Sequence, residues 1–350
     1  MTSQDERATP ELSPPATMIH LMMGLWISRA IYVAAKLGIA DLLKNNSKTV
    51  EELAEATGTD AASLYRVMRA MASIGVFAEN GRSHFALTPL GETLRSDVPG
   101  SLRAWVLMQS GEENYQAWGD LMHSVQKGEP AFGHVFGMGQ WQYRAQNPES
   151  AKVFDEAMAS LTGMSTAAVL SSYSFSRFDK IVDVGGGNGS LLAATLEANH
   201  TTKGVLFDLP HVTEKAKRQL VNAGVAEHCE VIAGDAFTSV PEGGDTYILS
   251  RVIHDWDDAR ATAILKNCRR AIVGTGKLLV IENVVGPLNA PDIAKFLDLT
   301  MLVVAGGRER NEIEYRTLLE ASGFTLTKII PTPSVLGLSV IESTPAGGHS

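Results

Sequence analysis

Lys180–Leu192, with the sequence KIVDVGGGNGSLL, is the stretch that decides how the rest of this chain is organised. Ile181, Val182 and Val184 predict a short buried strand, and Ser190 opens a run of residues typical of a helix. The glycines between them indicate a tight turn, because glycine adopts backbone conformations that side chains forbid and lets a ligand approach the main chain. The stretch therefore predicts a strand, a glycine loop and a helix; an ordinary strand-to-helix turn is the alternative to a ligand site.

The ligand of this loop is not expected to be a nucleotide phosphate. The dinucleotide-binding pattern G-x-G-x-x-G needs a glycine at position 190, where this chain has a serine. Asp183 lies two residues before the first glycine, where its charge opposes a pyrophosphate but suits a ligand that carries an ammonium group. The form D-x-G-x-G-x-G resembles the first motif of the class I S-adenosylmethionine (SAM)-dependent methyltransferases.

Length and composition favour a globular protein of two domains. The chain has 350 residues, of which 45% are hydrophobic and 20% charged. Its formal net charge of −9 argues against a protein built mainly to neutralise phosphates, so no nucleic-acid partner is expected. Cys229 and Cys268 are too few for a disulfide framework and lack metal-ligand spacing. We therefore expect reduced thiols, a cytoplasmic location and no metal site.

The N-terminal region joins a polar tail to a very apolar segment. Residues 1–15 contain prolines and lack a signal-peptide pattern, so they predict a disordered tail. From residue 17 to 45 apolar side chains occur nearly all round the helical wheel, which predicts a helix buried in its own domain or, as we favour, in a homodimer contact. Because the segment includes Arg29, Lys36 and Asp41, it is not expected to span a membrane.

Residues 49–87 have the pattern of a winged helix-turn-helix. Thr49 with Glu52 predicts a capping box for a first helix, Gly58 marks a turn, and Thr59 or Asp60 is expected to cap a second helix. Two short apolar runs, at 76–78 and 84–87, flank a turn at 79–82 and predict a β wing.

DNA binding is a real alternative for such a fold, since the second helix of these proteins enters the major groove. That helix offers Arg66 and Arg69 here and is otherwise apolar, while Asp60 would face phosphate unfavourably. Packing is therefore the favoured role of that helix.

The rest of the chain changes character near residue 171. Residues 101–170 predict an irregular helical connector whose aromatic and methionine side chains form core or line an apolar pocket. From 171 to 345, predicted strands alternate with helices, which implies a parallel sheet covered on both faces. Two runs at 325–330 and 338–341 predict an antiparallel pair at the sheet edge. The predicted fold class is α/β, a Rossmann-like sheet with an N-terminal, mainly α-helical winged-helix domain.

Polar residues follow the predicted strands at the edge where open α/β sheets bind ligands. Asp208 ends the second strand about 20 residues after the loop, where a carboxylate commonly receives ribose hydroxyls. Asp235 and Phe237 follow the third strand and offer a carboxylate and an aromatic face for an adenine. Each residue alone is equally well explained as a cap or a turn residue, but together they predict a cofactor site.

His254 follows the fourth predicted strand. The aspartates after it are explained as caps of the next helix, whereas His254 is placed to face the ligand cleft and can accept a proton near neutral pH. A nearby carboxylate can hold its ring and tune its basicity. The candidates are Glu282, which ends the next strand, and Glu309, which is equally able to pair with an arginine on the surface.

Several motifs together resemble the plant caffeate/flavonoid-type O-methyltransferase family and its bacterial relatives. They are Asp183-Val-Gly-Gly-Gly-Asn-Gly, Phe207-Asp-Leu-Pro-His-Val, Gly234-Asp-Ala-Phe, Ile253-His-Asp-Trp-Asp-Asp, Glu282 and Gly306-Gly-Arg-Glu-Arg. The resemblance covers nearly the whole chain. It implies a winged-helix dimerisation domain at 16–100, a SAM-binding domain at 171–345, and methyl transfer to a hydroxyl, expected to be phenolic, on a small aromatic metabolite.

The resemblance also implies roles for individual residues. His254 is expected to be the general base, beside Glu282, Glu309 and Asp255. The plant enzymes have a lysine where this chain has Ser250, so the contact with adenosine is expected to differ. Other SAM reactions, such as N- or C-methylation, and a DNA-binding regulator remain as alternatives. The residues expected to contact SAM are Asp183, Gly185, Gly187, Asp208, Leu209, Asp235, Ala236, Phe237, Ser250 and Arg251.

Overall fold

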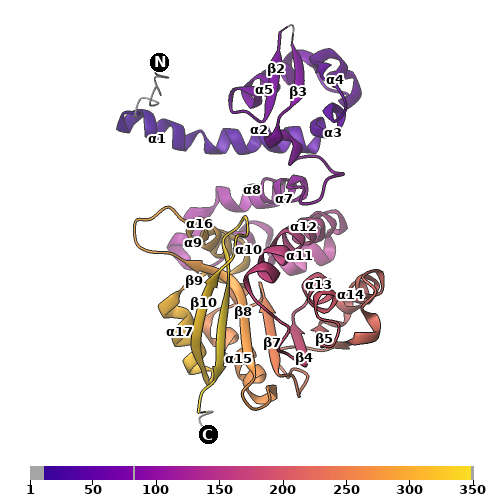
Figure 1. Ribbon diagram of the computed structural model, residues 1–350. Helices are drawn as coiled ribbons and strands as arrows, with labels where there is room; N and C mark the ends of the chain where they lie inside the picture. The colour runs from indigo at the N-terminus through magenta and orange to yellow at the C-terminus, as the bar shows by residue number, and fades with distance from the viewer. Residues whose placement is uncertain (1–11, 82, 348–350) are drawn as a thin grey trace, which may run out of the picture. The chain divides into compact units, whose positions relative to one another are not determined.

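The computed structural model describes residues 12–81 and 83–347 and divides into two compact units (Figure 1), which meet in sequence between Gly111 and Glu112. The expected tail, 1–15, lies outside the described residues as far as position 11, and the first helix begins at Pro14. Each unit has its own hydrophobic core, so each is described by itself.

The first unit is a helical domain with a small three-stranded antiparallel sheet in the order β1-β3-β2. The predicted capping box at Thr49 and Glu52 is present, and Asp60 caps the next helix by accepting from the Ser63 backbone N–H at 2.8 Å. A helix-turn-helix and a β hairpin therefore follow one another as predicted. Its elements are α1 (Pro14–Met22), α2 (Gly24–Lys36), α3 (Ile39–Leu43), β1 (Lys48–Thr49), α4 (Val50–Thr57), α5 (Ala61–Ser73), β2 (Phe77–Asn80), β3 (His84–Leu87), α6 (Pro89–Glu92) and α7 (Arg103–Gln109).

The apolar N-terminal segment differs from its prediction in two ways. It forms α1, α2 and α3 instead of one helix, with Gly38 in the left-handed conformation before α3. The segment Pro14–Lys36 is also long and apolar enough to cross a bilayer by length and composition, with a mean hydropathy of 1.4, contrary to the expectation. Asp41 lies beyond it, which leaves Arg29 and Lys36 as its charged residues. A core helix of a soluble protein and a signal sequence pass the same test, so a single such helix is weak evidence for a membrane.

The second unit carries a mixed sheet in the order β10-β11-β8-β7-β4-β5-β6, with the short β9 paired to β8. The strands from β4 to β8 run parallel, while β10 and β11 form the predicted antiparallel pair at one edge. The strands are β4 (Lys180–Val184), β5 (Lys203–Asp208), β6 (Cys229–Ala233), β7 (Thr246–Ser250), β8 (Lys277–Val285), β9 (Arg310–Asn311), β10 (Phe324–Pro331) and β11 (Leu338–Pro345).

Helices cover both faces of this sheet (Figure 1). Side chains alternate between the faces: Val182 and Leu249 pack with residues of α15 and α17, whereas Ile181 and Ile248 pack with residues of α12, α13 and α14. The helical elements of this unit are α8 (Glu112–Gly119), α9 (Leu121–Lys127), α10 (Ala131–Phe136), α11 (Gln140–Gln146), α12 (Pro148–Ser172), α13 (Ser190–Ala198), α14 (Pro210–Asn222), η1 (Ala226–His228), η2 (Ile253–Asp255), α15 (Asp258–Ala271), α16 (Ile293–Thr300), the π-helix η3 (Met301–Ala305) and α17 (Glu312–Ala321).

Candidate active site

The glycine loop between β4 and α13 is as tight as its sequence predicts. Gly185, Gly187 and Gly189 have φ values of 70°, 60° and 80°, in the left-handed region that side chains rarely adopt. A β-carbon on Gly185 would lie 2.7 Å from a methyl carbon of Val252, so this glycine also allows a close approach between segments. A β-carbon on Gly187 would meet nothing within 4 Å, so the backbone there borders open space.

Asp208 holds this loop from the end of the neighbouring strand. Its carboxylate accepts hydrogen bonds from the backbone N–H of Gly187 at 2.8 Å and of Leu209 at 2.7 Å. Burial raises the pKa of Asp208, although these hydrogen bonds oppose the change. Its remaining acceptor capacity lies at the C-terminal edge of β5, where ribose hydroxyls were expected.

Asp183 is a buried carboxylate under the same loop. It is 1% exposed, and neither of its oxygens has a hydrogen-bond partner among the described residues. Burial, helped by the charge of Asp208, raises its pKa to about 7. A buried carboxylate without a donor is costly, so this environment suits a cationic or hydrogen-bond-donating ligand group.

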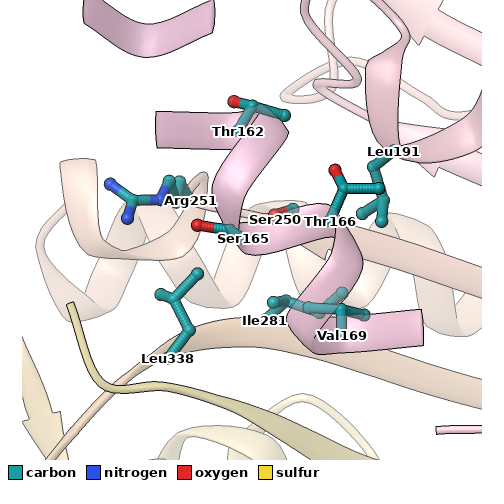
Figure 2. Close-up of a pocket in the computed structure, with 9 residues that line it drawn as sticks. All are labelled: Thr162, Ser165, Thr166, Val169, Leu191, Ser250, Arg251, Ile281 and Leu338. Atoms are coloured by element: carbon teal, nitrogen blue, oxygen red, sulfur yellow. The ribbon is translucent and has the colours of Figure 1, made fainter. Parts of the chain in front are cut away.

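Ser250 and Arg251 border a small cavity of mixed polar and apolar lining at the end of β7 (Figure 2). Arg251 has a φ of 56°, which is uncommon for a residue with a side chain, and its Nε and Nη2 atoms are buried without a partner in the part of the chain that the structure describes. The hydroxyl of Thr166 is buried in the same way. The cavity volume is about 10 Å³, room for one water-sized group. Its lining residues are Thr162, Ser165, Thr166, Val169, Leu191, Ser250, Arg251, Ile281 and Leu338.

The turn after β6 presents Phe237. Asp235 accepts from the Phe237 backbone N–H at 2.9 Å, and the carbonyl of Ala236 accepts from the Asn267 side chain at 2.6 Å, so the turn is fixed at two points. The Phe237 ring stays 37% exposed and meets Trp256 edge to face at 4.9 Å between centroids. An exposed, oriented aromatic ring at this strand end fits an adenine.

His254 lies in η2, directly after β7, in a turn that Glu282 holds. Glu282 is fully buried, and its Oε1 accepts from the backbone N–H groups of Val252 and Ile253, each at 2.9 Å. The Nδ1 atom of His254 lies 2.9 Å from Glu309 Oε1 and 3.5 Å from Glu282 Oε2. The structure thus brings together the histidine and both of the predicted carboxylates.

Asp255 lies on the other side of the ring and is not a helix cap. Its Oδ1 is 3.8 Å from His254 Nε2, whereas Asp257 caps α15 by accepting from the Arg260 N–H at 2.8 Å. Burial by itself would lower the pKa of His254, but Glu282, Glu309 and Asp255 outweigh burial and raise that pKa to about 10. The pKa of Glu282 is also raised, by burial first of all. The imidazole is therefore a strong base that binds a proton tightly.

The segment after the π-helix η3 delivers Glu309 to the histidine instead of to the surface. A β-carbon on Gly307 would lie 1.9 Å from the His254 carbonyl oxygen, so only glycine fits there. The Arg308 backbone N–H donates to that carbonyl at 2.8 Å, and the Glu309 N–H donates to Asp298 at 2.9 Å. Glu309 is 3% exposed, so the alternative of a surface pair with an arginine is wrong.

Two further residues belong to this site and were missed from the sequence. Arg310 is fully buried and donates to the carbonyls of Ile253 and Trp256, which fixes the turn on both sides of His254. The Gly-Gly-Arg-Glu-Arg run pointed to this segment but not to that role. Arg144 is 7% exposed and stacks 3.9 Å over the Phe154 ring. Burial raises the pKa of Asp255, and the charge of Arg144 partly opposes that rise. No sequence pattern distinguished it from a surface arginine.

Comparison with known proteins places this arrangement in a family. A model of the O-methyltransferase domain matches residues 118–325, and a model of the O-methyltransferase dimerisation domain matches residues 19–97. The chain belongs to this O-methyltransferase family. It is a SAM-dependent enzyme with an N-terminal dimerisation domain, as its sequence motifs predict.

Individual relatives align over nearly the full chain. Phenazine O-methyltransferase PhzM of Lysobacter antibioticus is 46% identical over 99% of this chain and 100% of its own length. A solved structure of LaPhzM, also 46% identical, has a TM-score of 0.88 and covers 95% of this chain and 100% of that one. The NcsB1 O-methyltransferase, solved with SAM and 2-hydroxy-5-methyl naphthoic acid, is 31% identical, with a TM-score of 0.81 over 96% and 100% of the two chains.

Some relatives act on nitrogen. Phenazine-1-carboxylate N-methyltransferase of Pseudomonas aeruginosa is 33% identical over 92% of this chain and 95% of its own length. Enzymes with this fold therefore include some that methylate oxygen and some that methylate nitrogen. The unpartnered groups of Asp183 and Arg251 and the open side of Gly187 fit SAM, the family's cofactor, whose methionine part carries both an ammonium and a carboxylate group.

Proposed function

We propose that this enzyme methylates a phenolic hydroxyl of a small aromatic metabolite, with His254 as the general base. The observation that carries the proposal is the bond between His254 Nδ1 and the buried Glu309. A carboxylate only accepts hydrogen bonds, so Nδ1 is the donor, and in the neutral ring the lone pair is then on Nε2. Nε2 is the atom free to take a proton from an acceptor.

The chemistry that this geometry supports is the transfer of one methyl group to a hydroxyl, which loses its proton. SAM supplies a methyl group on a positively charged sulfur. The acceptor hydroxyl would give its proton to Nε2 of His254 while its oxygen gains the methyl group, and the sulfur would keep the electron pair of the broken C–S bond and become neutral. A phenol has a pKa of about 10, close to that of His254, so the proton moves between partners of matched basicity. Glu282 and Glu309 stabilise the imidazolium that results.

The remaining predicted site residues are proposed to bind SAM. Asp208 is positioned for the ribose hydroxyls, and Asp235, Ala236 and Phe237 for the adenine. Asp183 suits the ammonium group, reached through the Gly185–Gly187 loop, while Ser250 and Arg251 suit the carboxylate. Leu209 contributes its backbone N–H to holding Asp208.

We also propose that the enzyme works as a homodimer in the cytoplasm. α1 has no buried residues, and its apolar side chains Met18, Ile19 and Leu21 are each at least 60% exposed. The match to a dimerisation domain from residue 19 supports a second subunit, not a membrane, as the cover of this surface. We propose residues 16–100 as that domain, 101–170 as the segment that lines the acceptor site, and 171–345 as the SAM-binding domain.

Methylation of nitrogen is a second candidate, favoured by the relative that methylates a phenazine nitrogen. A ring nitrogen already presents a lone pair and needs no base. The two candidates therefore predict different effects of removing His254.

The test is an incubation of the protein with labelled SAM and a panel of phenols, naphthols, hydroxyphenazines and amines. We expect transfer to a hydroxyl that falls by roughly 10²- to 10⁴-fold in His254→Ala, with SAM affinity retained. Transfer to nitrogen that survives the substitution would favour the second candidate. Transfer to a hydroxyl that survives would remove His254 from the mechanism.

A further inference from the structure

A second set of metal-ligating side chains lies apart from the His254 cluster. Asp120 precedes α9, His123 lies in its first turn, and His134 lies near the end of α10. One ligand atom from each of the three lies within 4.8 Å of the others. We propose that Asp120, His123 and His134 form a binding site for Zn²⁺ or a similar divalent transition metal.

The backbone that carries these residues is held in place. The buried hydroxyl of Ser124, next to His123, accepts from the Ala131 N–H at 2.9 Å, which ties α9 to α10. α9 ends at Gly128 with a φ of 71°, and Pro130 starts α10, so the connection between the helices is short. The three side chains therefore project from a fixed hairpin, and ordering them for a metal costs little backbone entropy.

The carboxylate of Asp120 is turned away from its own helix. It stands at the N-cap position of α9 but makes no capping hydrogen bond, although aspartate is among the best caps. It lies instead 2.7 Å from Nδ1 of His134. An aspartate beside the ring nitrogen of a histidine offers both an oxygen ligand and a partner that orients the imidazole.

The two histidine rings are already adjacent. They stack with centroids 3.9 Å apart and an angle of 5° between their planes. Zinc binds nitrogen and carboxylate oxygen at roughly 2.0–2.2 Å, which places tetrahedral ligand atoms about 3.4 Å apart. The His134 and Asp120 side chains are 58% and 33% exposed and free to rotate. Metal binding would widen their 2.7 Å contact and turn the two parallel rings so that their in-plane lone pairs meet at the ion, with water completing the coordination. Two imidazoles and a carboxylate suit zinc, nickel or copper better than magnesium or calcium.

A bound ion would brace the hairpin against the segment that leads to Glu309. Ala131 and Phe132 of α10 pack with Val303 and Val304 of η3 in one hydrophobic cluster. The metal is expected to stabilise this packing without contacting the reacting atoms.

The test is a calorimetric titration of the full chain with ZnCl₂, after removal of any histidine tag. We expect about one site per chain that is lost in the double variant His123→Ala/His134→Ala and weakened at least tenfold by Asp120→Asn. His200→Ala, which removes an exposed histidine elsewhere, is the matched control and leaves the affinity unchanged. The ligand-field spectrum of bound Co²⁺ is an independent readout of nitrogen ligation.

Three results would overturn the proposal. They are no binding up to about 1 mM ZnCl₂, equal binding by the wild type and the folded double variant, and binding that persists in the double variant but is lost in His254→Ala. The last result would place the metal on His254, Glu282 and Glu309, whose ligand atoms are also within 4.8 Å of one another.

Discussion

Replacing Glu309 with glutamine is the sharpest perturbation of the proposed base. Glutamine keeps the size of the side chain and an oxygen that can accept from His254 Nδ1, now 2.9 Å away, but removes the charge. Hydrogen bonds to charged groups contribute about 1.5–3 kcal/mol, so the pKa of His254 should fall by roughly 1–2 units from about 10. A weaker base takes the hydroxyl proton less readily.

The expected result is a pH-dependent loss of activity. The base must be unprotonated, so activity rises as the pH passes the pKa of His254, and in Glu309→Gln this rise moves to lower pH. At high pH kcat should fall about tenfold. Near neutral pH the difference should shrink, because more of the variant's histidine is already unprotonated.

The pH dependence of the protein's stability gives a second test of the same contact. A histidine whose folded-state pKa is raised stabilises the fold below about pH 6.5, and that stabilisation is lost as the pH rises toward 10. Glu309→Gln should flatten this decline in Tm. The fold itself should persist, because two carboxylates, Glu282 and Asp255, still neutralise the ring.

The assay is a pH series of kcat and KM with one acceptor, measured for the wild type, Glu309→Gln and His254→Ala. In His254→Ala the base is absent, so the pH dependence that remains reports the ionisation of the acceptor hydroxyl itself. Glu312→Gln is the matched control, because it makes the same substitution at an exposed side chain. A wild-type-like profile in Glu309→Gln, or a uniform loss at every pH without a shift, would refute the reasoning that Glu309 tunes the base.

Three further changes test other parts of the molecule. Asp208→Asn should weaken SAM binding by roughly tenfold or more, measured by calorimetry, because it removes the charge that we propose receives the ribose hydroxyls. Gly185→Ala should lower both Tm and SAM affinity, since the new β-carbon meets Val252 at 2.7 Å and φ is 70°; unchanged values would contradict the loop geometry. Leu21→Glu with Trp26→Glu, at side chains 69% and 68% exposed, should convert the dimer to monomers in light scattering, and a dimer that persists would place the interface elsewhere.

Much of the fold followed from local patterns. The strand at 180–184, the glycine loop and the helix from Ser190 were predictable because each depends on the residues within it. The same holds for the caps at Thr49 and Asp60, which bond to residues three positions away. The three separate N-terminal helices were not predicted, although the break before α3 falls at Gly38, a glycine in the left-handed conformation.

The site divides in the same way. The sequence by itself identified His254 and its candidate carboxylates, because the ends of parallel strands converge at one edge of a sheet. It left open whether Glu309 pairs with the histidine or an arginine, and it gave no sign of the role of Arg310 or of the Asp120, His123 and His134 cluster. Only folding brings His254 and Glu309 together across 55 positions, and the neighbouring carboxylates then outweigh burial in setting the pKa of His254. Local sequence determines where a helix or strand forms. The distances between distant side chains and their removal from water decide the chemistry of the site, and both arise only in the tertiary structure.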